Sequence, residues 1–116
     1  MEAKINKQKV YVLNEESAWD YIDTSWDAPR IFKNAADALK AFNEAVAEAD
    51  RDWCERFGIT PEEIKTYEEG DAISEDDIVR NLTYDKEQKW YVYSSYQEGW
   101  YNAFRICITL REITVE

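Results

Sequence analysis

Between residues 34 and 57, apolar side chains recur every three or four positions and fall within about a third of the circumference of a helix. The stripe consists of Ala35, Leu39, Phe42, Val46, Ala49, Trp53 and Phe57. Asn34 suits an N-cap, Asp37 favours the positive end of a helix, and Gly58 suits the left-handed position after one. The sequence therefore predicts a long amphipathic helix over residues 35–57, with its stripe covered by another layer of the fold.

Four segments have the β-branched and aromatic composition or the period-two alternation of strands. They are residues 9–13, 30–32, 89–96 and 100–115. In the last segment Phe104, Ile106 and Ile108 share one face, which we expect to be buried. We expect this final strand to lie in the centre of the sheet and to pair with the first strand.

Two further segments carry helix start signals. Thr60, Pro61 and Glu63 form a capping box with proline at the first helical position, which predicts a helical turn at about residues 61–67. Ser74 precedes three acids in the same way and predicts a second turn at about residues 75–80. Residues between 14 and 28 interleave acids with aromatics and are expected to form a loop.

Together these elements predict a single α+β domain over residues 1–116, with two strands, a long helix, two short helical turns and two strands in chain order. The sheet is expected to be antiparallel, with about four strands, and the helix to pack on one of its faces.

The charge balance narrows the choice of partners. The chain has 25 acidic residues against 14 basic ones, a formal net charge of −11, and no histidine. This balance argues against direct binding to nucleic acid or to anionic membranes, and it favours a basic protein partner or simple solubility. No segment is apolar enough to span a membrane, and the first residues lack the apolar core of a secretory signal, so a cytoplasmic protein is expected.

The sequence carries no signature of catalysis or of cofactor binding. Glycine-rich nucleotide loops, nucleophile elbows and zinc motifs are absent, and the lack of histidine removes the commonest general base and metal ligand. The acids near Asp71 and Asp76 do not have the spacing of a calcium loop, so we expect no metal site. Cys54 and Cys107 are expected to be small buried side chains, and a disulfide or a reactive thiolate is the alternative.

Two groups of residues are candidates for binding a partner. The first, which we call the acidic patch, consists of Glu62, Glu63, Glu68, Glu69, Asp71, Glu75, Asp76 and Asp77. The second, which we call the aromatic loop, consists of Trp19, Tyr21 and Trp26. Exposed tryptophan and tyrosine beside acids are typical of protein interfaces. We expect Tyr91 and Tyr93, by contrast, to cover the outer face of the sheet beneath Arg105 and Arg111.

The hypothesis that follows is a non-catalytic acidic protein-binding module. In its sharpest form the protein mimics nucleic acid and inhibits a basic nucleic-acid-binding protein, as anti-restriction and anti-CRISPR proteins of phages and mobile elements do. The alternatives are a module that stacks sugars, peptides or another small ligand on exposed aromatics, and a domain whose acidity only keeps it soluble. A homodimer formed through an edge strand also stays open.

Overall fold

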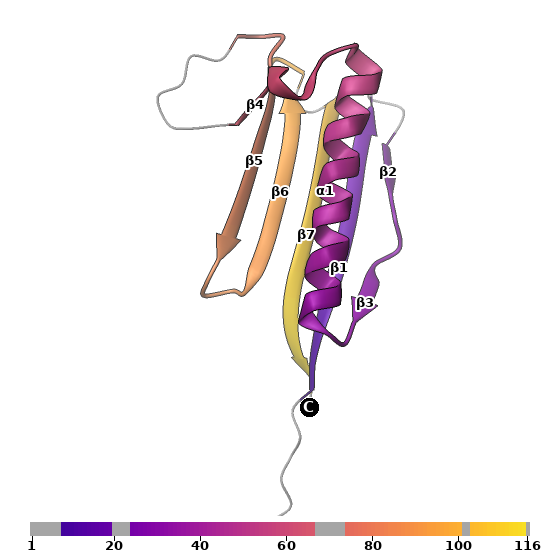
Figure 1. Cartoon of the computed structure of the whole chain (residues 1–116), viewed down its shortest axis with the longest axis vertical. Helices are drawn as coiled ribbons and strands as arrows, with labels where there is room; N and C mark the ends of the chain where they lie inside the picture. The colour runs from indigo at the N-terminus through magenta and orange to yellow at the C-terminus, as the bar shows by residue number, and fades with distance from the viewer. Residues whose placement is uncertain (1–7, 20–23, 67–73, 101–102, 116) are drawn as a thin grey trace, which may run out of the picture.

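A computed structural model describes residues 8–19, 24–66, 74–100 and 103–115 of the chain. Within these residues one long helix lies lengthwise along a sheet (Figure 1). The strands are β1 (Gln8–Trp19), β2 (Thr24–Trp26), β3 (Arg30–Phe32), β4 (Ile64–Thr66), β5 (Ile78–Asp85), β6 (Trp90–Gln97) and β7 (Phe104–Val115). The helices are α1 (Ala35–Phe57) and the 3-10 helix η1 (Pro61–Glu63).

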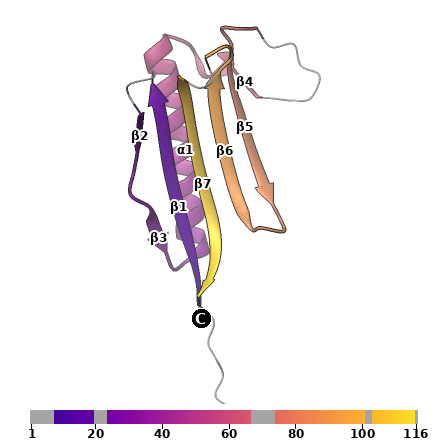
Figure 2. The ribbon, with the colours of Figure 1, turned by 180° about the vertical axis from the view of Figure 1, so that it is seen from behind.

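The described strands form one sheet in the order β2-β1-β7-β6-β5-β4, and β3 pairs with β1 on the same side as β2. All pairs are antiparallel except β4 with β5, which makes the sheet mixed. α1 packs over β1 and β7 on one face, and Figure 2 shows the other face from behind. The predicted α+β class and the helix on one sheet face are confirmed. The prediction of about four strands, all antiparallel, is wrong in detail.

Both ends of α1 are fixed by local signals. The Oδ1 atom of Asn34 accepts hydrogen bonds from the backbone N–H groups of Ala36 and Asp37, at 2.8 and 3.1 Å. Gly58 adopts φ +63°, and its N–H donates to the carbonyl of Cys54. Glycine adopts this left-handed conformation most easily, because it has no Cβ. The predicted helix therefore begins and ends where the sequence indicated.

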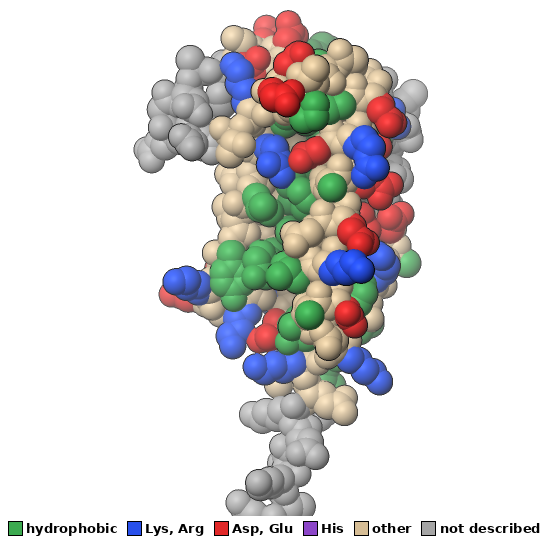
Figure 3. All heavy atoms as spheres, viewed as in Figure 1, with side chains coloured by type: hydrophobic (Ala, Val, Ile, Leu, Met, Phe, Trp, Pro, Cys, Tyr) green, Lys and Arg blue, Asp and Glu red, His purple; other side chains and the backbone are tan. Residues whose placement is uncertain are grey.

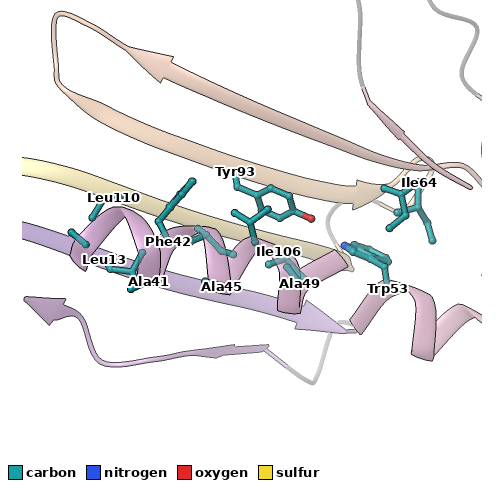
Figure 4. Close-up of a cluster of buried hydrophobic side chains, with 14 residues drawn as sticks. Leu13, Ala41, Phe42, Ala45, Ala49, Trp53, Ile64, Tyr93, Ile106 and Leu110 are labelled. Carbon is teal, nitrogen blue, oxygen red and sulfur yellow. The ribbon is translucent and has the colours of Figure 1, made fainter. Parts of the chain in front are cut away.

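The core lies between α1 and the inner face of the sheet, which is the face that α1 covers (Figure 4). Trp53, Phe42 and Val46 from the predicted stripe are buried there, facing β-strand residues. The strands contribute Leu13, Tyr93, Ile106, Ile108 and Leu110 to this core. Ile106 and Ile108 are buried as predicted, and β7 pairs with β1 and β6 in the centre of the sheet.

β1 is longer than the predicted strand at residues 9–13 and runs on through the polar residues up to Trp19. Pairing with β7 is continuous from Gln8 opposite Val115 to Trp19 opposite Phe104. A long neighbour holds the polar half of β1 extended, because each backbone N–H and C=O finds a partner there. The prediction of a loop over residues 14–28 is therefore wrong for its first six residues, and it is also wrong for β2.

The turn predicted at residues 75–80 is right only at its start, where the N–H of Asp77 donates to the carbonyl of Ser74 at 3.0 Å. Ile78 and Val79 are instead buried at the start of β5. The turn predicted at residues 61–67 is right only for its first residues. η1 ends at Glu63, and Ile64 begins β4. β-branched side chains in these two segments bring their backbones into a parallel pair, which the start signals did not reveal.

Tyr91 and Tyr93 lie on the inner face, so the prediction that they cover the outer face is wrong. Tyr93 is fully buried opposite Ile108, and the ring of Tyr91 lies 5.6 Å from that of Phe42. The register with β7 decides this, because it pairs both tyrosines with apolar residues of the helix side. On the outer face, Arg111 instead lies over the ring of Trp90, at 5.8 Å.

Candidate functional site

The acidic patch is partly committed to local structure. Asp77 accepts hydrogen bonds from Lys65 Nζ at 2.7 Å and from the backbone N–H of Ser74 at 2.8 Å. The hydrogen bond from Lys65 is the main cause that lowers the pKa of the Asp77 carboxyl below its usual value. Asp77 therefore holds the turn before β5, and its charge is already paired.

The rest of the acidic patch is dispersed in the described structure. Glu63 accepts hydrogen bonds from Thr60 and closes the predicted capping box. Glu62, Glu75 and Asp76 are exposed. Glu68, Glu69 and Asp71 lie outside the described residues. The described members thus lie on two separate segments, η1 and the turn before β5.

The aromatic loop is not a loop at Trp19. That residue ends β1, half-buried, with its ring 4.8 Å from the ring of Trp53 and the guanidinium of Arg56 4.2 Å from its centroid. Trp26 belongs to β2, and its backbone pairs with Glu16. Tyr21 lies outside the described residues. Trp19 is therefore part of the packing between helix and sheet.

The structure brings together a different group of acids, which we call the carboxylate groove. It consists of Glu15, Asp27, Glu48 and Asp52. Glu16 also lines it, but its carboxylate lies on the other face of the sheet beside Arg105, because successive side chains of β1 alternate between the two faces. α1 contributes one wall and β1 the other, while small or apolar side chains such as Ala49 and Ile108 form the floor. Figure 3 shows acidic side chains gathered along the flank of the helix that faces β2 and β3.

Electrostatic repulsion is built into the carboxylate groove. Burial, together with the nearby charges of Asp27 and Glu48, raises the pKa of Glu15, although Arg30 opposes the shift. The Arg30 guanidinium lies 3.5 Å from the Glu15 carboxylate. Glu16 is paired more closely, at 2.7 Å from Arg105. The groove is thus a site where an added positive charge would relieve repulsion.

This groove was not predicted from the sequence, because its acids lie on separate segments of the chain. Glu48 and Asp52 lie within the predicted helix, and Asp27 lies within the segment that was expected to be a loop. Glu15 reaches them only because β1 continues past residue 13 and its outer edge is covered by β2 and β3. The backbone N–H of Asp27 donates to the carbonyl of Glu15 at 3.0 Å, which fixes the two acids side by side.

Replacing Glu15 with glutamine is expected to stabilise the fold at neutral pH. A carboxyl whose folded-state pKa is raised contributes stability at low pH and loses it as pH rises through that pKa. The thermal midpoint of Glu15→Gln should therefore exceed that of the wild type at pH 7. The corresponding gain in the free energy of unfolding should be less than about 1 kcal/mol. The melting curves of the variant and the wild type should converge as the pH falls towards 4.5, which is the ordinary pKa of a glutamate.

Glu16→Gln is the matched control for this prediction, because its carboxylate is paired with Arg105. Its thermal midpoint at pH 7 should not rise. A lower midpoint for Glu15→Gln than for the wild type at pH 7 would contradict the electrostatic description of the groove.

A second concavity, which we call the aromatic pocket, lies between the first turns of α1 and the end of the β5–β6 hairpin. It is lined by Tyr11, Ala35, Leu39, Tyr84, Lys89, Tyr91, Leu110 and Glu112. The rings of Tyr84 and Tyr91 are 4.5 Å apart. Its volume of about 170 Å³ is below the roughly 300–1,000 Å³ of pockets for drug-sized ligands. It has room for one side chain or one small ring.

Polar groups join α1 to the strands beside the core. The Tyr93 hydroxyl donates to Asp50 Oδ1 at 2.7 Å, and Arg80 Nε lies 3.2 Å from the same oxygen. Trp53 Nε1 donates to the Ser95 hydroxyl at 2.7 Å. Burial raises the pKa of Tyr93, so the hydroxyl stays a donor. These contacts hold the helix in register on the sheet.

Cys54 and Cys107 are free, half-buried and on different elements. Burial is the main cause that raises the pKa of each thiol, which favours the protonated form. Among the described residues, no three His, Cys, Asp or Glu side chains are grouped closely enough to hold a metal ion. No helix in the described part of the chain is both long and apolar enough to cross a membrane.

No protein-family model, curated protein or solved structure matches this chain.

Proposed function

We propose that the protein is a non-catalytic binding module that docks the carboxylate groove onto a basic surface of a protein partner. The observation that carries the proposal is that four acids from α1, β1 and the segment after β2, namely Glu15, Asp27, Glu48 and Asp52, line one groove. Burial is the main cause of the raised pKa of Glu15, and the charges of Asp27 and Glu48 add to it. Lysine or arginine side chains of a partner would relieve this repulsion.

The charge of the whole chain also supports binding to a basic partner. A formal net charge of −11 speeds the encounter with a positively charged partner and repels nucleic acid and anionic lipid. Nucleic-acid-binding proteins present lysine and arginine side chains to phosphates, so they have strongly basic surfaces. We therefore propose that the partner belongs to this class and that the carboxylates take the place of phosphates, in the manner of an inhibitor carried by a phage or mobile element.

Reversing the charge of the groove is expected to abolish capture of the partner. The groove variant combines Asp27→Lys, Glu48→Lys and Asp52→Lys, three acids that line the groove. Immobilised wild-type and variant proteins are exposed to nuclease-treated bacterial extract at low salt, and retained proteins are identified by mass spectrometry. We expect the protein retained by the wild type to fall at least about tenfold on the variant, since several close charge pairs are lost.

The control variant combines Glu62→Lys, Glu75→Lys and Glu87→Lys, which changes the net charge equally at exposed acids outside the groove. It should retain the partner. Glu62 and Glu75 also belong to the acidic patch, so the opposite result, loss on the control and retention on the groove variant, would move the binding site to that patch. Asp77 is left intact in both variants because it holds the turn before β5.

A second candidate function is the binding of a small ligand or a peptide side chain in the aromatic pocket. The observation that favours it is the pair of tyrosine rings, Tyr84 and Tyr91, over a small concavity floored by Leu110. Such binding is mainly apolar, so it should persist at high salt, whereas docking through carboxylates should weaken steeply.

A further inference from the structure

The two edges of the sheet differ in how much of their backbone is paired. On the β1 edge, β3 pairs with residues 11–13 and β2 with residues 16–18. On the β5 edge, β4 pairs only with residues 78–80. In the part of the chain that the structure describes, the outer edge of β5 therefore has no strand beside residues 81–85, which offers backbone donors and acceptors for another strand.

This edge also carries exposed apolar side chains. Leu82 and Tyr84 are 48% and 47% exposed on the helix side of the sheet. α1 lies over β1 and β7 rather than over β5 (Figure 1). Figure 3 shows hydrophobic side chains gathered beside the helix over the lower half of β5 and β6. Exposed apolar groups along an unpaired edge are the composition of a strand that accepts a partner.

We propose that β5 pairs antiparallel with β5 of a second copy of this chain, with Thr83 opposite Thr83 across a twofold axis. This inference does not rest on the carboxylate groove. In this register Leu82 lies opposite Tyr84 of the second copy on the helix side. On the other side Asn81 lies opposite Asp85.

The side chains in this register complement one another. Two Leu82–Tyr84 pairs form on the helix side, and aromatic–aliphatic cross-strand pairs are favourable. On the other side the Asn81 amide can donate to Asp85, whose Oδ1 already accepts from the backbone N–H groups of residues 87 and 88, so Oδ2 is the natural acceptor. Among the paired residues 81–85, no two like charges lie directly opposite each other.

Neighbouring registers are less favourable. A shift of two residues towards the hairpin turn places Leu82 opposite Lys86. The apolar contact between Leu82 and Tyr84 is then replaced by one between Leu82 and a charged side chain. A shift of two residues the other way brings the second copy against β4, which already occupies the edge at Arg80. The side chains and β4 thus select the register centred on Thr83.

The helices leave room for this dimer. A twofold axis perpendicular to the sheet places both copies of α1 on the same side. β6 and β5 of each copy then lie between the two helices, with strands about 4.8 Å apart. The helices therefore do not collide. A five-residue ribbon is smaller than a standard interface, so the dimer should be weak and dependent on concentration.

Two double variants test the register, and each places two charges on the helix side of β5. In Leu82→Lys/Tyr84→Lys, introduced lysines face lysines across the interface. In Leu82→Lys/Tyr84→Glu, each introduced lysine faces an introduced glutamate. Sedimentation velocity between roughly 5 and 500 μM should show a wild-type dimer at the upper end, a monomer for the first variant throughout, and recovery of the dimer for the second.

The matched control is Ile31→Lys, at an apolar residue of β3 that is 67% exposed. It should dimerise as the wild type does. Each variant is expected to fold, because the substituted side chains are exposed. Far-ultraviolet circular dichroism verifies this. A wild type that stays monomeric throughout, a dimer that survives the lysine–lysine variant, or no recovery with the lysine–glutamate variant would overturn the proposal.

Discussion

Replacing Trp53 with alanine is expected to lower the free energy of unfolding by about 3–5 kcal/mol. Trp53 is fully buried, and its ring lies 4.8 Å from that of Trp19 and 5.4 Å from that of Phe57. Its removal leaves a large cavity between α1 and the sheet. It also deprives the buried hydroxyl of Ser95 of its donor, which sits at 2.7 Å.

The size of this effect matters because domains of this kind are stable by only about 5–15 kcal/mol. Urea titration followed by tryptophan fluorescence and circular dichroism should show an earlier midpoint, with a variant that is partly unfolded at 37 °C. Trp100→Ala is the control, since that side chain is 46% exposed and should cost less than about 1 kcal/mol. Equal losses for the two variants would contradict the described core.

Replacing Asp50 with alanine is the second large change, with an expected loss of about 2–3 kcal/mol. The Asp50 carboxylate accepts the Tyr93 hydroxyl at 2.7 Å and faces Arg80 Nε at 3.2 Å. The Nε atom is buried and has no hydrogen bond with good geometry, so the charge of Asp50 is its main compensation. Without the carboxylate, a buried hydroxyl and a guanidinium both lose their partner.

Chemical unfolding of three variants separates these contributions. Asp50→Asn keeps an acceptor for Tyr93 and should lose less than Asp50→Ala. Tyr93→Phe removes the hydroxyl alone and should cost about 1 kcal/mol. Glu44→Ala, at an exposed acid on the same helix, should change stability by less than about 0.5 kcal/mol. An Asp50→Ala protein as stable as Glu44→Ala would show that the polar contacts contribute nothing.

The parts of the fold that could be predicted are those encoded locally. Asn34, the apolar stripe through Trp53, and Gly58 each act within a few residues of the helix, so α1 could be placed to the residue. The alternation of β7 identified its buried face for the same reason. Such signals do not depend on which other segment lies alongside.

The missed elements depend on a distant partner. Residues 14–19 are polar, and only the continuous ladder with β7 makes them strand. Ile78 follows a helix start signal, but parallel pairing with β4 and antiparallel pairing with β6 outweigh that local preference. The face of the sheet on which Tyr93 lies was predicted wrongly. A shift of one residue in the pairing with β7 would move every side chain of β6 to the other face, and the sequence alone does not fix that pairing.

The candidate site was predictable in chemistry but not in place. Composition indicated an acidic surface, yet the acidic patch chosen around Asp77 contains a carboxylate that is already paired with Lys65. Glu15 joined the groove only through the extension of β1. Trp19 was assigned to a surface loop because its partner Trp53 lies on another element.

The salt dependence of capture tests the proposed docking of the carboxylate groove most directly. The immobilised protein is exposed to nuclease-treated extract at low salt, and retained proteins are eluted in steps up to roughly 1 M salt, where exposed charges more than about 3 Å apart are screened. We predict that a basic nucleic-acid-binding protein is released at moderate salt. Retention that survives the highest salt, or no specific protein retained at all, would contradict docking through carboxylates.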